Sequence, residues 1–363
     1  MKTETRSYMR WAKLHQKVRY DLTISDIPGA ELTDIQATTS NVSLKVDGAY
    51  GHPQLISAIA QRYEFHEEGV VPVPGASSGN FIALAVAGRS GQTILLEQPV
   101  YEPIERAAAF MGFNTILLHR RPESGFAVDP KEVEIGLSNG ASAVVLTNLH
   151  NPSGQCLSRG TVEEIADRCE HAGATLIVDE AYLDGAHLVA GGPMWTAANV
   201  SSNVIVTSTL TKVYGLGGLR AGWILAHDEM ADRAREMMDI LSVCNAAPAA
   251  SLAVRAFECI SHLEKRYRDC HKQGQLIFQS WIENEPLVRR YDNHGALFEC
   301  VGLPPGVTGD RLNDLLAGEY DTQVTPGSFF GLPDHIRLSI THPPDQQTEA
   351  LSRISKALAT LVV

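Results

Sequence analysis

Short apolar runs rich in β-branched residues alternate with helical patterns through the middle of this chain. Six such runs occur, at Thr93–Glu97, Asn114–Leu118, Ala143–Thr147, Thr175–Asp179, Asn203–Ser208 and Gly222–Ala226. Several are separated by helical patterns, such as Pro103–Met111 and Arg159–Ala172. Buried strands that alternate with helices predict an α/β fold with a largely parallel sheet covered on both faces. Because ligands of such sheets bind outside the carboxyl ends of the strands, functional residues are expected there.

The C-terminal third shows a different pattern, in which helical segments surround short strands. The helical segments are Ala249–Glu283 and Asp310–Ala317, and the strands lie near Gly295–Cys300 and His335–Ser339. A chain of 363 residues exceeds a typical single domain, so a large and a small domain are expected. We place the large domain at residues 40–245. The smaller α+β domain is expected to combine residues 1–39 with residues 246–363.

Charge and cysteine usage restrict the classes of partner. The formal net charge of −12 argues against nucleic acid or an anionic membrane surface as the main partner. The N-terminal stretch MKTETRSYMRW lacks the apolar run of a secretory signal, and no apolar stretch approaches membrane-spanning length. The six cysteines show neither C-x-x-C nor metal-ligand spacing. We therefore expect reduced thiols in a cytoplasmic protein without a metal site.

Polar residues follow three of the predicted strands at their carboxyl ends. Asp179-Glu180-Ala181-Tyr182 follows one strand, and Asn151-Pro152-Ser153-Gly154 follows another. A third strand leads into Thr209-Leu210-Thr211-Lys212 and a glycine-rich stretch that ends at Arg220. Taken singly, each segment has a structural explanation, as a turn, a helix cap or solvated surface. Their order and spacing together indicate a functional site.

In this order the motifs resemble those of the class I/II aminotransferases, which are fold-type I enzymes that use pyridoxal-5′-phosphate (PLP). The resemblance extends over most of the chain. It rests on GASSGN (Gly75–Asn80), QPVY (Gln98–Tyr101), NPSG (Asn151–Gly154), DEAY (Asp179–Tyr182), TLTKVYGLGGLRAG (Thr209–Gly222), VTPGSFFG (Val324–Gly331) and IRLSI (Ile336–Ile340). It implies a large domain with a mostly parallel seven-stranded sheet and a smaller α+β domain.

The resemblance also implies a role for each residue around the cofactor ring. Lys212 would hold PLP as a Schiff base and later move a proton at the α-carbon of the substrate. Asp179 would lie against the pyridine nitrogen and favour its protonated form, which is the electron sink. Asn151 and Tyr182 would bind the 3-oxygen of the ring, and Tyr101 would stack on its face.

The phosphate group requires hydrogen-bond donors and positive charge. The backbone amides of Gly75, Ala76 and Ser77 precede the apolar helix Phe81–Ala87, and a helix N-terminus binds anions. The resemblance adds the hydroxyl groups of Thr209 and Thr211 and the guanidinium of Arg220, eight residues after the lysine. The family usually has serine at one or both threonine positions.

Tyr50, in the segment AYGHPQL, resembles a tyrosine that reaches the phosphate from the neighbouring subunit. Its spacing to the following glycine is shorter than in many members of the family. This match implies a homodimer with shared active sites.

Arg337 in IRLSI matches the arginine that holds the α-carboxylate of the substrate, together with Asn151. The predicted function is therefore an aminotransferase that moves an α-amino group from an amino acid to a 2-oxo acid. A PLP-dependent lyase or synthase, which uses the same stabilised carbanion for β- or γ-chemistry, stays open because fold-level likeness does not separate the two. A helix is expected over Tyr8–Lys17. For the N-terminal arm around Trp11, Tyr20 and Asp26 we expect mainly a packing role, with closure of the substrate pocket as the alternative.

Other interpretations explain fewer residues. GASSG also fits the nucleophile elbow G-x-S-x-G of serine hydrolases, with Ser77 as nucleophile and His294, His335 or His342 as its partner. That interpretation leaves Lys212 and its neighbours unexplained. GLGGL follows a lysine rather than a bare strand end, so it is not a dinucleotide loop, and no P-loop motif occurs. A non-catalytic regulator is disfavoured because the lysine is retained and no length remains for a DNA-binding module.

Overall fold

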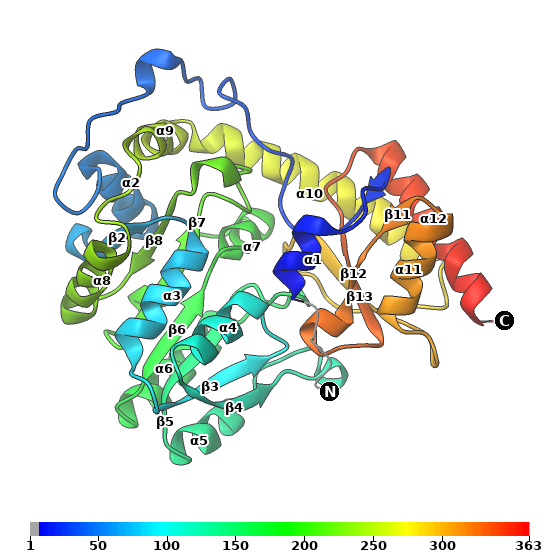
Figure 1. Cartoon of the computed structure of the whole chain (residues 1–363), viewed down its shortest axis with the longest axis horizontal. Helices are drawn as coiled ribbons and strands as arrows, with labels where there is room; N and C mark the ends of the chain where they lie inside the picture. The colour runs from blue at the N-terminus through cyan, green and yellow to red at the C-terminus, as the bar shows by residue number, and fades with distance from the viewer. Residues whose placement is uncertain (1–6, 363) are drawn as a thin grey trace.

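A seven-stranded sheet forms the larger of two bodies in the computed structural model, which describes residues 7–362 (Figure 1). The strand order is β2-β8-β7-β6-β5-β3-β4, and only β8 runs antiparallel to its neighbours. The strands are β2 (Val70–Val73), β3 (Thr93–Gln98), β4 (Asn114–His119), β5 (Ala141–Thr147), β6 (Thr175–Asp179), β7 (Val204–Thr209) and β8 (Gly222–Leu225). The prediction of a mostly parallel seven-stranded sheet is confirmed.

Helices cover both faces of this sheet because successive residues of a strand point to opposite faces. In β5, Val144 and Leu146 pack against one core and Ala143 and Val145 against the other. The helices are α2 (Pro53–Tyr63), α3 (Ala76–Ala87), α4 (Glu102–Phe110), α5 (Pro130–Ser138), α6 (Arg159–His171), α7 (Leu183–Ala190), α8 (Asp228–Leu241) and α9 (Ala247–Glu258). Local sequence sets where they begin: Ser158 caps α6 by accepting a hydrogen bond from the backbone of Thr161 at 3.1 Å.

The second body contains a four-stranded sheet in the order β12-β13-β10-β9. Its elements are α10 (Ile260–Ile282), β9 (Arg289–Arg290), β10 (Phe298–Gly302), α11 (Gly309–Glu319), β12 (Thr325–Pro326), β13 (His335–Ser339) and α12 (Pro344–Val362). The N-terminal segment joins this body, since β1 (Tyr20–Asp21) pairs in parallel with β11 (Thr322–Gln323). Helix α1 (Tyr8–Leu14) lies between the two bodies (Figure 1).

Three local expectations differ from the structure. The helical segment Ala249–Glu283 is two helices, because the backbone of Cys259 leaves helical geometry between α9 and α10. The N-terminal helix ends at Leu14, three residues before the expected Lys17. Strand β2 is not among the six predicted runs. It contains Pro72, which lacks a backbone N–H and is tolerated because β2 is an edge strand.

All six cysteines are free thiols. Between residues 7 and 362, none of the helices combines the length and the apolar character that a membrane crossing requires.

Candidate active site

A cavity of about 700 Å³ lies at the carboxyl ends of three neighbouring strands. Thr147, Asp179 and Thr209 are the last residues of β5, β6 and β7, and each lines the cavity. The first turn of α3 and one face of α1 complete the wall. The cavity therefore lies where a parallel sheet is expected to bind its ligand.

Lys212 reaches the centre of this cavity from the loop after β7. Its Nζ atom donates a hydrogen bond to Ser25 Oγ at 3.1 Å and lies 6.0 Å from the centroid of the Tyr182 ring. Burial by itself lowers the pKa of Lys212, but Tyr182 and Asp26 raise it, and the net pKa lies above the ordinary value. The Lys212 amine is thus protonated at neutral pH.

Asp179 is buried at the end of β6 and is oriented by two donors. Asn80 Nδ2 donates to Asp179 Oδ2 at 2.6 Å, and the backbone of Ala181 donates to Oδ1 at 2.9 Å. Thr207 in turn donates to Asn80 Oδ1 at 2.6 Å, which orients the amide. Burial raises the pKa of Asp179, while these hydrogen bonds and the charge of Lys212 act in the opposite direction. Asn80 and Thr207 had no role in the sequence prediction.

Donors for an anion gather where α3 begins. Ala76 and Ser77 line the cavity, and Gly75 caps the helix with a φ of +83°. A Cβ atom at Gly75 would lie 2.3 Å from a guanidinium nitrogen of Arg220, so the cation packs directly on the bare backbone. Arg220, Thr209 and Thr211 also line the cavity, and the two threonine hydroxyls are 2.9 Å apart.

The two aromatic residues of the prediction face the same space. Tyr101 and Tyr182 both line the cavity, and burial raises the pKa of Tyr101 to about 12. Burial also raises the pKa of Tyr182, although the nearby Lys212 lowers it. Tyr101 donates a hydrogen bond to the sulfur of Met9 at 3.4 Å. Both phenols are therefore protonated at neutral pH.

Arg337 lies directly behind the cavity wall, 1% exposed. Its Nη1 donates to Asn151 Oδ1 at 2.8 Å, and its Nη2 donates to Tyr8 Oη at 2.9 Å and to the carbonyl of Thr23 at 3.2 Å. Three aromatic rings surround the guanidinium, those of Tyr8, Phe298 and Phe330. Within residues 7–362 no carboxylate forms an ion pair with it, so this buried cation lacks an anionic partner there.

The N-terminal arm has a larger part in the cavity than expected. Tyr8, Met9, Ala12 and Lys13 of α1 form one wall, and Asp26 lines the cavity beside Lys212. Two other residues of the arm do have packing roles. Trp11 packs on Phe329 at a ring distance of 4.9 Å, and Tyr20 is buried in the core around the smaller sheet.

Tyr50 lies apart from the other predicted residues. Its side chain is 52% exposed and lines a separate small hollow with Val71, Arg235 and Val243. The guanidinium carbon of Arg235 lies 5.8 Å from the ring centroid of Tyr50. Within one chain, therefore, Tyr50 does not join the cavity.

The surroundings of Ser77 lack the partner that a nucleophilic serine requires. In the described part of the chain, no histidine is among the residues that line the cavity. His335, one of the three candidates, shares hydrogen bonds with Tyr291 and Asp334 in the smaller body. The arrangement gives the serine-hydrolase interpretation no support.

Comparisons with known proteins agree with this geometry. The family model described as "Aminotransferase class I and II" matches residues 22–354. A capreomycidine synthase from Streptomyces vinaceus is 25% identical over 312 residues, covering 85% of this chain and 80% of that protein. An arginine–pyruvate transaminase from Pseudomonas aeruginosa is 23% identical over 302 residues, covering 81% of this chain and 76% of that protein.

Solved structures show the same fold. A PLP-dependent aminotransferase from Streptococcus suis superposes with a TM-score of 0.90 at 19% identity, covering 97% of this chain and 96% of that chain. The prediction of a fold-type I architecture is confirmed.

Proposed function

Because the chain belongs to the class I and II aminotransferases and is an enzyme of the transferase class, we propose that it moves an α-amino group from an amino acid to a 2-oxo acid with PLP bound at Lys212. The family implies the cofactor. An amino acid would be the donor of the amino group and a 2-oxo acid its acceptor. Both would react in the cavity at the strand ends.

The residues around the cavity fit PLP. At one end, the guanidinium of Arg220 packs on the bare backbone of Gly75, where a Cβ atom would collide with it; we call this pair of groups the anion cradle. At the other end, Asp179 is a buried carboxylate whose hydrogen bonds leave it facing the cavity beside Lys212. A phosphate at the first position and a protonated pyridine at the second would satisfy both groups.

When bound, PLP supplies an electron sink for negative charge that develops at the α-carbon of the substrate. The chain supplies positioning and proton transfer. The Lys212 amine is proposed to hold the cofactor and then to move the proton of the α-carbon, because it is the basic group at the centre of the cavity. Asn151 and Tyr182 would bind the 3-oxygen of the ring, and Tyr101 would pack on its face.

The observation that carries the proposal is that Arg337 is buried and, within residues 7–362, forms no ion pair. A buried guanidinium without a counter-ion is costly, and a carboxylate is the ligand that matches its two-pronged geometry. The α-carboxylate is the one feature that all α-amino acids and 2-oxo acids share. Arg337 can therefore serve both half-reactions without selecting the side chain.

A panel experiment tests the proposed function. Purified protein with PLP should be trapped by borohydride as an adduct at Lys212, identified by peptide mass, and Lys212→Ala should lose that adduct. Mixing the loaded enzyme with single amino acids should convert the cofactor to its amine form for the substrates it accepts, with release of the matching 2-oxo acid. A protein that takes up no PLP would overturn the proposal.

A lyase or synthase reaction is the second candidate, because one of the relatives is a capreomycidine synthase. The same panel separates the two. An aminotransferase leaves the cofactor in its amine form until a 2-oxo acid is added. A lyase or synthase returns the cofactor to its starting absorbance without a 2-oxo acid. Its product has lost a side-chain group of the amino acid substrate or carries a different group in its place.

We further propose that two copies of the chain share their active sites through Tyr50. Two observations support this: Tyr50 is exposed and lies outside the cavity of its own chain. A phenol that is to bind a phosphate in a second subunit has to be placed on the surface in this way.

A further inference from the structure

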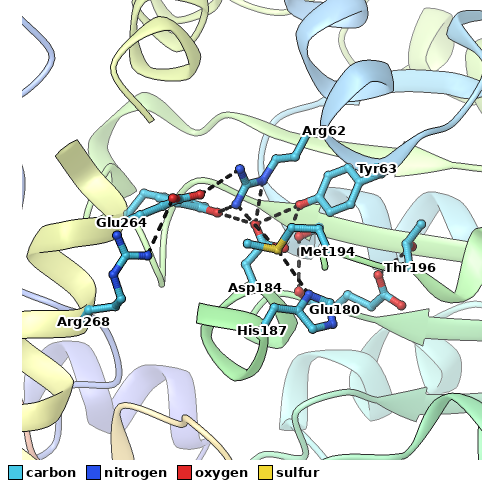
Figure 2. A network of polar contacts seen from close by, with 11 residues as sticks. Arg62, Tyr63, Glu180, Asp184, His187, Met194, Thr196, Glu264 and Arg268 are labelled. Carbon is cyan, nitrogen blue, oxygen red and sulfur yellow. Dashed lines mark hydrogen bonds and ion pairs between the residues drawn. The ribbon is translucent and has the colours of Figure 1, made fainter. Parts of the chain in front are cut away.

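A buried network of polar side chains lies outside the cavity, around Asp184 (Figure 2). Asp184 is 5% exposed and stands in the first turn of α7, two residues after Tyr182. Tyr63 of α2 donates to the Asp184 carboxylate at 3.1 Å, and Arg62 Nε donates to Asp184 Oδ2 at 3.1 Å. Donors from three side chains, those of Arg62, Tyr63 and Tyr214, therefore fix this carboxylate in one place.

Tyr214 connects this network to the lysine loop. It stands two residues after Lys212 and is 1% exposed. Its hydroxyl accepts a hydrogen bond from Arg62 Nη2 at 2.5 Å and donates one to Asp184 Oδ2. Burial and the charge of Asp184 hold the pKa of Tyr214 well above its ordinary value, so the hydroxyl stays a donor.

The network also extends to the start of α10. Arg62 Nη1 pairs with Glu264 at 3.1 Å, and Arg268 lies 3.8 Å from the other oxygen of Glu264. With two arginines and two carboxylates the charges balance. The side chain of Arg62 is only 9% exposed, so its hydrogen bonds act in a medium of low dielectric constant, where they are strong.

We propose that Asp184 and Tyr214 are positioning residues that set the spacing between Lys212 and Tyr182. Asp184 stands two residues after Tyr182, and Tyr214 stands two residues after Lys212. Two residues of chain span no more than about 7 Å. Their buried hydrogen bond therefore links the two backbones next to the cavity, where Lys212 Nζ lies 6.0 Å from the Tyr182 ring. Neither residue lines the cavity, so both act through their neighbours. The inference rests on the proposed function, in which Lys212 holds PLP.

The test compares two tyrosine-to-phenylalanine variants, Tyr214→Phe and Tyr63→Phe. Each removes a buried hydroxyl that donates a hydrogen bond to Asp184, but only Tyr214 belongs to the lysine loop. PLP is added to the cofactor-free protein, and the adduct at Lys212 is trapped with borohydride at successive times. We expect Tyr214→Phe to slow the capture about tenfold or more, since small misplacements of a reacting group are costly. Tyr63→Phe should slow it less than about threefold.

Two further measurements make the outcome decisive. Urea unfolding of both variants should show similar losses of stability, so that a difference in capture rate reports position rather than folding. If Tyr214→Phe fails to fold, Asp184→Asn takes its place, since an amide of the same size keeps part of the network. Equal capture rates for the wild type and these variants would overturn the inference. Absence of any adduct in the wild type would instead refute the proposed function.

Discussion

Arg337 Nη1 and Asn151 Oδ1 are 2.8 Å apart, which joins the four-stranded sheet to the loop after β5 across 186 positions of the sequence. Both side chains are buried, and the contact closes one side of the cavity. The amide that is proposed to bind the cofactor ring is thereby also a partner of the cation that is proposed to bind the substrate.

Replacement of Arg337 by alanine should lower kcat/KM by about 30- to 5,000-fold, because loss of a buried charge-assisted pair costs about 2–5 kcal/mol. The loss should be similar for every accepted amino acid, while the borohydride-trapped adduct at Lys212 is unchanged. Arg337→Lys should recover only part of the activity, since a point charge lacks the two-pronged geometry. Normal turnover by Arg337→Ala would exclude Arg337 as the carboxylate site.

Tyr8→Phe should lower kcat/KM by about tenfold, because a hydrogen bond to a charged group is worth about 1.5 kcal/mol or more. The physical reason is the 2.9 Å contact from Arg337 Nη2, which holds the guanidinium in place. In the Arg337→Ala background the same change should have little effect, because the two residues act together. Additive losses in the double variant would show that Tyr8 acts independently of Arg337.

Gly75→Ala should weaken PLP binding about tenfold or more, measured by equilibrium dialysis. The new Cβ would meet the Arg220 guanidinium, and a φ of +83° is strained for alanine. Gly91→Ala is the matched control: its φ is +86°, and nothing lies within 4 Å of the added Cβ. Both variants should lose about 1–2 kcal/mol of stability. Equal PLP affinities in the two variants would count against the anion cradle.

Mixed dimers test the role proposed for Tyr50. Lys212→Ala and Tyr50→Ala subunits should each be weakly active alone, and mixing them should restore part of the activity. In such a dimer one of the two sites has both wild-type residues. Light scattering should give the mass of two chains. A stable and fully active monomer would refute shared active sites.

Glu299 should contribute a loss of stability as the pH rises from about 5 to about 7. Burial raises the pKa of Glu299 from 4.5 to about 7, although hydrogen bonds from Gln275 and Asn293 lower it. The folded state thus holds a proton that the unfolded state releases, and this stabilisation is complete below about 4.5 and lost as the pH passes about 7. In urea titrations between about pH 5 and 7, Glu299→Gln should remove this negative contribution and so make the slope of the unfolding free energy against pH more positive, by up to about 1.4 kcal/mol per pH unit. An unchanged slope would mean that Glu299 stays ionised in the folded protein.

The parts that sequence predicts well are those set by short-range pattern. The predicted strand Thr175–Asp179 has the same bounds as β6. The apolar, β-branched run marks where the strand lies, and the acidic residues Asp179 and Glu180 mark its carboxyl end. The residues after that strand and its neighbours could then be placed at one edge of the sheet. Lys212 and Asp179 accordingly line one cavity.

The parts that sequence did not predict depend on long-range contacts. Tyr8 meets Arg337 across 329 positions, and no local signal in the N-terminal helix distinguishes a cavity wall from a packed surface. Asn80 lies in a recognised motif, but its role appears only when β7 brings Thr207 beside it. The chain turns at Cys259 between α9 and α10. No glycine or proline stands at that position, so the sequence carries no local signal for the break.

The parallel pairing of Tyr20–Asp21 with Thr322–Gln323 has a consequence for the order in which the protein is made. All seven strands of the larger sheet have been synthesised once residue 225 is complete, so that sheet has its whole sequence long before β11 exists. The first segment of the chain must wait for residues about 300 positions later before it finds its partner strand. During synthesis the lysine loop is therefore complete before Arg337 and β11 exist, and the substrate side of the cavity can be assembled only after residue 337 has been made.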